Sequence, residues 1–373
     1  MWYKNAVIFT PSGFVEGAFS VEEGRFRTLC PGDCPDPDAV DLQGARVLPG
    51  LVDIHTHGNS GADFSDGDLA GLESMGRYLA RHGVTAFAPA SMTLPYAALS
   101  RAFSTAKALH GRRPEDCARL AGIHMEGPYL SPARKGAQNG AFLRLPDPVG
   151  FATLQRDCGG LIRIVGIAPE LPGAEDFIRQ AGAHCTVSLA HTDADYEQAQ
   201  RAFAAGARHL THLFNAMPPI HHRQPGVIGA AADREDVTVE LICDGLHVHP
   251  SAVRMAFRLF PGRVCLISDA LRCCGMSQGI YELAGQQVML SGGAARLADG
   301  TLAGSAANLF DCLRNAIAFG IPPEQAIPSA TAVPARVIGA ADIGVIAPGM
   351  RADFLVCDGD WNLGAVYLGG VQV

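Results

Sequence analysis

Two histidines, His55 and His57, stand two residues apart at the end of an apolar segment, PGLVDIHTHG at residues 49–58. Side chains alternate along a strand, so residues two apart share a face and both imidazoles can reach one metal ion. The flanking residues make this pair more specific than an isolated His-x-His. We predict a metal site here; the alternative is an ordinary turn after a strand.

Three further residues of metal-binding type each stand at the end of a predicted strand: Glu126 after residues 120–125, His191 after 187–190 and His212 after 208–211. Two imidazoles and one carboxylate form a normal shell for catalytic zinc and leave one position open for water. A buried carboxylate without a cation is costly. We predict that these three residues hold the main metal. His209 and His184, nearer the middle and start of their strands, are predicted to be structural.

Asp269 ends another predicted strand, in the segment VCLISDA at residues 264–270. A carboxylate beside an activated water can take its proton and pass it to a leaving amine. We predict this role for Asp269, with a helix N-cap as the alternative.

These residues follow strand-like segments that alternate with helical ones. Near-continuous apolar runs are typical of parallel strands buried on both faces, and eight of them occur, at residues 47–54, 85–90, 120–125, 161–167, 184–189, 207–210, 237–242 and 263–267. Eight β/α units predict a (β/α)8 TIM-type barrel over residues 49–343. In such barrels the chemistry lies at the C-terminal ends of the strands.

Both ends of the chain are strand-like. Short β segments with turns fill the first 48 residues, and two more lie at residues 352–357 and 364–368. The expectation is a small β-sandwich domain built from both termini, residues 1–48 plus 344–373.

Composition excludes several classes of protein. Hydrophobic residues make up 48% of the 373 residues and charged residues 18%, which indicates a sizeable core. A net charge of −8 with no basic block argues against nucleic-acid binding. No apolar run approaches the about 20 residues that span a bilayer, and no signal peptide is evident. The 11 scattered cysteines predict buried thiols in a reducing compartment. We expect a cytoplasmic protein without a membrane or nucleic-acid partner.

The chain resembles the N-acetylglucosamine-6-phosphate deacetylases of the amidohydrolase superfamily almost end to end. The segments that carry the resemblance are HMEGPYL at 124–130, KGAQN at 135–139, AHT at 190–192, THLFNAM at 211–217, DGLHV at 244–248 and SDA at 268–270. The resemblance implies a β-sandwich plus barrel, a homodimer, and hydrolysis of an N-acetyl group from an amino-sugar phosphate. The N-acetylgalactosamine epimer is an alternative substrate. A cyclic amide hydrolase or deaminase is less favoured, because a carboxylated lysine is common there and no strand ends on lysine here.

The resemblance also implies roles for individual residues. Asn215 and Ala216 are expected to present backbone N–H groups to the phosphate. Arg223 and His247 are expected to line the sugar phosphate across the subunit interface. Gln138 stands where some members carry a histidine near the acetyl carbonyl.

Within this family some members replace His-x-His and keep one metal, whereas others retain it. Because this chain retains it, we expect a second metal at His55 and His57, bridged by Glu126. Zinc, iron and manganese all suit a shell of imidazole and carboxylate.

Overall fold

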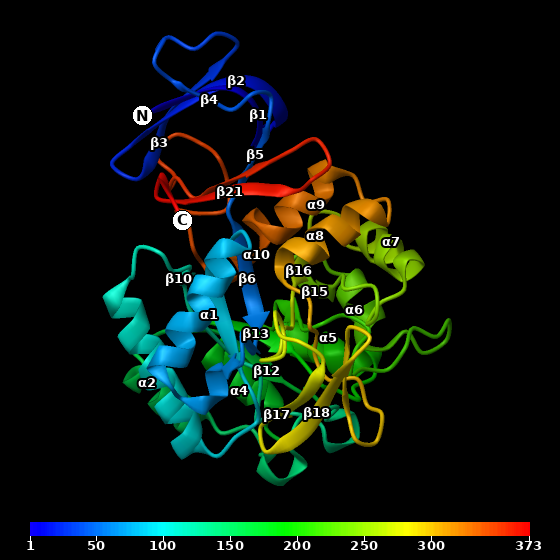
Figure 1. Ribbon diagram of the computed structural model, residues 1–373. Coiled ribbons are helices and arrows are strands. Elements are labelled where there is room, and N and C mark those ends of the chain that lie inside the picture. The colour runs from blue at the N-terminus through cyan, green and yellow to red at the C-terminus, as the bar shows by residue number, and fades with distance from the viewer.

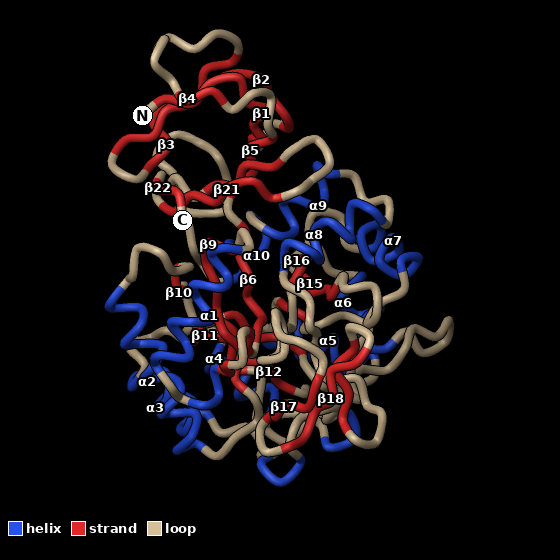
Figure 2. The backbone as a smooth tube through the Cα atoms, in the orientation of Figure 1, coloured by secondary structure: helices blue, strands red, loops and turns tan.

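Each of the eight predicted apolar runs contains a parallel strand of a nearly closed barrel (Figures 1 and 2). The computed structural model describes residues 1–373. Strands follow one another in chain order, and a parallel bridge between Thr56 and Ala270 joins the last strand to the first. The barrel strands are β6 (Leu51–Thr56), β9 (Val84–Ser91), β11 (Ile123–Met125), β12 (Ile162–Ile167), β13 (Thr186–Leu189), β14 (His209–Leu210), β15 (Thr238–Ile242) and β16 (Val264–Ile267).

Helices surround these strands and bury their outer faces in one cluster of 69 residues. Aspartates cap several helix starts; Asp68, for example, accepts hydrogen bonds from two backbone N–H groups of α1. A second, smaller core lies inside the barrel and is closed by residues of α10. The helices are α1 (Leu69–Arg81), α2 (Tyr96–Arg112), α3 (Pro148–Asp157), α4 (Ala174–Ala181), α5 (Tyr196–Ala205), α6 (Gly226–Ala232), α7 (Pro250–Leu259), α8 (Leu309–Ala318), α9 (Pro323–Ala330) and α10 (Ala332–Val337). None of them is long and apolar enough to cross a membrane.

Strands from both ends of the chain join in one sheet of eight strands, with blue and red strands side by side in Figure 1. Its order is β22-β21-β20-β5-β1-β2-β3, with β4 beside β1. Phe26 of β3 and Phe354 of β20 are four places apart in this order, yet their ring centroids are only 5.9 Å apart. The sheet therefore folds over its own aromatic core, as the predicted sandwich requires. The strands are β1 (Trp2–Thr10), β2 (Gly13–Glu22), β3 (Arg25–Pro31), β4 (Val40–Asp41), β5 (Arg46–Pro49), β20 (Phe354–Cys357), β21 (Leu363–Leu368) and β22 (Val371–Gln372). The domain boundaries at residues 48 and 344 stay a prediction.

A three-stranded antiparallel sheet, absent from the sequence-based expectation, is inserted after the last barrel strand. It comprises β17 (Gly279–Leu283), β18 (Gln286–Ser291) and β19 (Ala294–Leu297). Gln286 donates a 2.7 Å hydrogen bond to the carbonyl of Ala137, which ties the insertion to the loop after β11. The insertion therefore lies over the C-terminal mouth of the barrel. Short elements complete the fold: β7 (Gly58–Asn59), β8 (Ala62–Asp63), β10 (Arg119–Leu120) and 3-10 turns at Phe64–Asp66, Pro132–Arg134 and Gly140–Phe142.

Gly50 links β5 of the small sheet to β6 of the barrel and allows close approach to β9. A Cβ atom there would lie 2.1 Å from Thr85 Oγ1 and 2.5 Å from its Cγ2. Thr85 is buried and β-branched, so it has few rotamers with which to yield. We expect Gly50→Ala to lower the free energy of unfolding by about 1–3 kcal/mol, the usual cost of overpacking. Thermal and denaturant unfolding measure this change.

Gly111→Ala is the matched control for this prediction. Gly111 lies in the last turn of α2, and a Cβ atom there meets nothing within 4 Å. Alanine is the better helix former, so this variant should gain up to about 1 kcal/mol. A Gly50→Ala protein as stable as the Gly111→Ala protein would show that β9 yields at no cost.

Candidate active site

Five of the barrel strands direct polar side chains toward one point at the barrel mouth. His55 lies in β6 and His57 just beyond it, while Glu126, His191, His212 and Asp269 follow β11, β13, β14 and β16. His191, His212 and Asp269 have positive φ angles of 43°, 28° and 48°. Residues other than glycine rarely adopt this conformation, and it concentrates where surrounding structure holds a functional group in place. The predicted residues thus converge through turns that reorient the chain at the strand ends.

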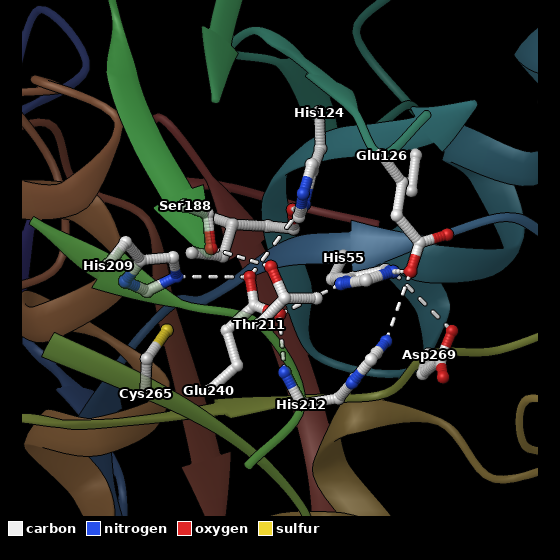
Figure 3. A network of polar contacts seen from close by, with 12 residues as sticks. His55, His124, Glu126, Ser188, His209, Thr211, His212, Glu240, Cys265 and Asp269 are labelled. Atoms are coloured by element: carbon white, nitrogen blue, oxygen red, sulfur yellow. Dashed lines mark hydrogen bonds and ion pairs between the residues drawn. The ribbon is translucent and has the colours of Figure 1, made fainter. Parts of the chain in front are cut away.

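The carboxylate of Glu126 contacts four of these side chains, and Figure 3 shows its contacts with His55 and His212. Its Oε1 atom lies 3.1 Å from His191 Nε2, 3.2 Å from His212 Nε2 and 3.4 Å from His55 Nε2. Its Oε2 atom lies 3.3 Å from His57 Nε2. One carboxylate therefore faces all four predicted imidazoles, three through Oε1 and one through Oε2.

The Nδ1 atoms of the four rings point away from Glu126 and meet acceptors only. Their partners are Ala90 O for His57 at 3.1 Å, Arg134 O for His191 at 2.9 Å, Asn215 O for His212 at 3.1 Å, and Glu240 Oε2 for His55 at 2.9 Å. A carbonyl or carboxylate oxygen cannot donate, so each Nδ1 carries a proton. In a neutral ring this leaves the Nε2 lone pair directed at Glu126, the arrangement that outer hydrogen bonds impose on metal-ligating histidines.

This donor set fits a divalent cation. The ligand atoms of Glu126, His191 and His212 lie within 4.8 Å of one another, as do those of His55, His57 and Glu126. The Nε2 atom of His55 is buried and has no hydrogen-bond partner. Buried polar atoms normally find partners, so an unsatisfied imidazole nitrogen beside two carboxylates indicates a missing ligand. Both groups share Glu126, which makes it the bridging residue if two ions bind.

Electrostatics at the site also favour a cation. Burial acts to raise the pKa of Glu126, but the charge on His55 and hydrogen bonds from His191 and His212 hold it well below its usual range. Asp269 behaves alike: burial raises its pKa, and His55 and His57 bring it below the ordinary value. Burial lowers the pKa of His57, but Asp269 and Glu126 outweigh it and raise it to about 10. Without an ion, the charged rings of His55 and His57 balance the two carboxylates; a divalent ion would supply that charge instead and leave the rings neutral.

Asp269 lies beside His55 and His57. Its Oδ1 atom lies 3.2 Å from His57 Nε2 and 3.5 Å from His55 Nε2. No helix begins at this residue, so the N-cap alternative is wrong. The Asp269 carboxylate instead borders a cavity of about 210 Å³ at the barrel mouth.

Nine of the eleven predicted site residues line that cavity: His57, Glu126, Gln138, His191, His212, Asn215, Ala216, His247 and Asp269. Leu283, Thr301 and Leu302, from and just beyond the inserted sheet, form part of its wall. His55 is fully buried beneath the cavity. The cavity thus combines the predicted ligands with a covering element that the sequence did not predict.

Gln138 has a defined amide orientation in this cavity. Its Oε1 atom accepts a 2.8 Å hydrogen bond from the backbone N–H of Thr93, so its Nε2 group must donate. One N–H points to Glu126 Oε2 at 2.6 Å. The second amide hydrogen is available to a bound molecule.

The structure bears on the predicted roles of His247, Asn215 and Arg223 at the phosphate. His247 lines the cavity of its own chain, where Asp244 accepts hydrogen bonds from its backbone N–H and its Nδ1 in the loop after β15; a role across a subunit interface stays a prediction. The N–H of Asn215 donates to His212 O at 2.9 Å, so only the N–H of Ala216 is free for an anion. Arg223 does not line this cavity; it is exposed on a separate loop, where it contacts His222.

Two buried residues of the site were missed by sequence reasoning. Glu240, in the middle of β15, hydrogen-bonds His55 and His209 and is fully buried. His124, in β11, packs its ring 4.4 Å from that of His55; burial lowers its pKa to about 3, so it is neutral. A signal for Glu240 did exist, since a carboxylate inside the apolar run VTVELI is expensive to bury without partners. His209 is buried, as predicted.

Comparison with known proteins places this site in a family. The model of the amidohydrolase family matches residues 46–370. An N-acetylglucosamine-6-phosphate deacetylase from Vibrio furnissii is 37% identical over 379 residues, covering 99% of this chain and 91% of the relative. The chain belongs to the N-acetylglucosamine-6-phosphate deacetylase branch of the amidohydrolase family. The predicted resemblance is therefore confirmed.

Other members of this deacetylase branch are equally informative. An N-acetylgalactosamine-6-phosphate deacetylase from Escherichia coli O157:H7 is 34% identical and covers 90% of each chain. The solved structure of a variant N-acetyl-D-glucosamine-6-phosphate deacetylase from Mycobacterium smegmatis, in complex with N-acetyl-D-glucosamine-6-phosphate, matches with a TM-score of 0.94 at 34% identity. The match covers 100% of this chain and 98% of that one. The chain is thus a hydrolytic enzyme that acts on a linear amide, on a barrel fold as predicted.

Proposed function

We propose that this enzyme hydrolyses N-acetyl-D-glucosamine 6-phosphate to D-glucosamine 6-phosphate and acetate, in amino-sugar metabolism. The observation that carries the proposal is the convergence of four Nε2 atoms on Glu126, with Asp269 beside them, in a cavity that could hold a small sugar. The substrate is inferred from the relatives, which are deacetylases of N-acetylglucosamine 6-phosphate. The relative from Escherichia coli O157:H7 makes the galactosamine epimer the second candidate.

Hydrolysis of an acetamide needs a stronger nucleophile than free water and a proton for the departing nitrogen. We propose that Asp269 supplies the proton transfer: its carboxylate accepts a proton from the attacking water and then donates it to the amine as the carbon–nitrogen bond breaks. Asp269 faces His57 at 3.2 Å, so its orientation is set before substrate arrives. Atoms balance, because the hydroxyl of water joins the acyl carbon to give acetic acid, which ionises to acetate, and the relayed proton completes the amine.

A divalent metal held by Glu126, His191 and His212 would polarise the acyl carbonyl and lower the pKa of the attacking water. We propose His55 and His57 as ligands of a second ion, with Glu126 shared between the two positions. Zinc is the proposed metal, with iron or manganese as alternatives that the same donors accept. One or two ions per subunit are compatible with this set.

On the substrate side, two N–H groups of this chain, on Gln138 and Ala216, are free to donate. The second amide hydrogen of Gln138 is proposed to contact the acetyl carbonyl. The N–H of Ala216 is proposed to bind the sugar phosphate, and the ring of His247, whose Nδ1–H donates to Asp244, is proposed to line it. Phosphate is recognised by such N–H donors and by cations.

Arg223 is proposed to complete the phosphate site of a partner subunit in a homodimer. It is exposed, and the cavity of its own chain contains no arginine or lysine side chain. A dianionic ligand normally meets at least one cation. We also propose a cytoplasmic location. All eleven cysteines are free thiols, which supports this proposal.

Acetate release tests the proposed function. The metal-loaded enzyme should release acetate from N-acetylglucosamine 6-phosphate, lose this activity on chelation and regain it when zinc is added. The galactosamine epimer and both unphosphorylated sugars are the comparison substrates. No acetate from any of the four would refute the deacetylase, and a preference for an unphosphorylated sugar would refute the roles of Arg223 and His247.

A mixing experiment tests the shared site. Asp269→Asn and Arg223→Ala proteins should each be nearly inactive, because one lacks the proton carrier and the other the cation. After subunit exchange the mixture should recover about a quarter of wild-type activity, since half of the dimers are mixed and each has one intact site. Absence of recovery despite exchange, shown with differently tagged chains, would place Arg223 outside the active site.

A further inference from the structure

Glu240 is a buried carboxylate that the proposed reaction does not use. It lies in β15 with no exposure and is surrounded by donors (Figure 3). Oε2 accepts from His55 Nδ1 at 2.9 Å and from the backbone N–H of His212 at 3.2 Å. Oε1 lies 3.1 Å from His209 Nε2. A single side chain thus contacts a proposed ligand of each metal position.

The partner of His55 differs in kind from the partners of the other three rings. His57, His191 and His212 each donate Nδ1–H to a neutral backbone carbonyl, whereas His55 donates to a charged carboxylate. A carboxylate behind a ligating histidine fixes its ring and makes the opposite nitrogen a better donor to metal. The opposite nitrogen of His55 is the buried Nε2 atom that lacks any hydrogen-bond partner.

Glu240 itself is held by groups that leave it little freedom. His209 Nδ1 lies 2.6 Å from Thr238 Oγ1, so the ring that contacts Glu240 is fixed at both nitrogens. A buried carboxylate is stable only with such a set of donors. The chain Thr238, His209, Glu240 and His55 therefore runs through the barrel interior to the second metal position.

We propose that Glu240 is a positioning residue of the second metal position, which orients His55 and strengthens its Nε2 atom as a ligand. The inference rests on the proposed function only in assuming that a second metal binds at His55 and His57. His212 depends less on Glu240, because the ring of His212 is held by the Asn215 carbonyl. Loss of Glu240 should consequently weaken one metal position far more than the other.

Calorimetric titration of the full-length apoenzyme with Zn²⁺ tests this proposal. Wild-type protein should show two binding steps, and His57→Ala should abolish the weaker one, which assigns it to the His55–His57–Glu126 group. In Glu240→Gln that step should weaken by about 10–100-fold, the usual effect of losing such an outer partner, while the tighter step changes by less than about threefold. Glu240→Leu, which cannot accept a hydrogen bond, should weaken the weaker step further. If the Glu240→Leu protein does not fold, the Glu240→Gln protein alone decides the test.

Leu241→Ala is the matched control, because Leu241 is the next residue of β15 and packs in the core between barrel and helices. It should lower the melting temperature without altering the ratio of the two steps. Equal weakening of both steps in Glu240→Gln, an unchanged weaker step, or a single step in wild-type protein would overturn the proposal. Failure of acetate release alone would refute the proposed function and leave the metal titration interpretable.

Discussion

Replacing Asp269 with asparagine is expected to lower turnover by about 10²–10⁴-fold, the contribution of a general base and acid. Asparagine has nearly the same shape but cannot take a proton from water. The ligand atoms of Glu126, His191 and His212 are untouched, so the main metal should remain bound. Steady-state kinetics on N-acetylglucosamine 6-phosphate, with metal content per subunit determined on the same sample, measure both effects.

Metal content decides how a slow Asp269→Asn enzyme is interpreted. Asp269 also lies 3.2 Å from His57 and is close to the second metal position. Loss of one ion along with activity would show a ligand role in addition to proton transfer. Turnover near the wild-type value would contradict the assignment of Asp269 as the proton carrier.

Glu126→Gln is expected to have the larger effect, because Glu126 belongs to both ligand groups. The NH₂ group of glutamine cannot bind a metal ion. Whichever way the amide turns, this NH₂ would face either the imidazole Nε2 atoms or the Gln138 NH₂ group, which now donates to Glu126 at 2.6 Å. The variant should bind neither ion firmly. Turnover should fall by about 10⁴-fold or more, since a bound metal contributes several kcal/mol and each 1.4 kcal/mol is a factor of ten.

Elemental analysis after gel filtration measures the metal that Glu126→Gln retains. Glu235→Gln is the control, because Glu235 is exposed in the loop before β15 and carries the same change of charge. That variant should keep wild-type metal content and turnover. A Glu126→Gln enzyme with full metal content would show that the imidazoles alone hold the ions.

The barrel and most of the site could be predicted because both depend on local pattern. Apolar runs mark buried strands, and a polar residue at the end of such a run marks the barrel mouth. Glu126, His191 and Asp269 stand at those positions and were identified by type and place. Family resemblance then supplied Gln138 and the phosphate-side residues.

The residues that escaped prediction depend on contacts between distant segments. Glu240 meets His55 across 185 positions of sequence, and no local pattern encodes that pairing. The N–H of Ala216 is free and that of Asn215 is engaged because of a turn at these residues. The residue types do not dictate the φ angles of that turn. The inserted sheet was overlooked because its strands are half exposed and lack the long apolar runs of the barrel.

The folded-over sheet has a consequence for synthesis of the chain on the ribosome. Strand β5 lies between β1 and β20, and Pro49 pairs with Phe354 near the far end of the sequence. The aromatic core around Phe19 is completed by Phe354, so it cannot close until translation has passed residue 354. Contacts this distant in sequence form late and slowly. The first strands therefore lack this cover until β20 has been made, and the strand that leads to His55 and His57 is anchored at its start only then.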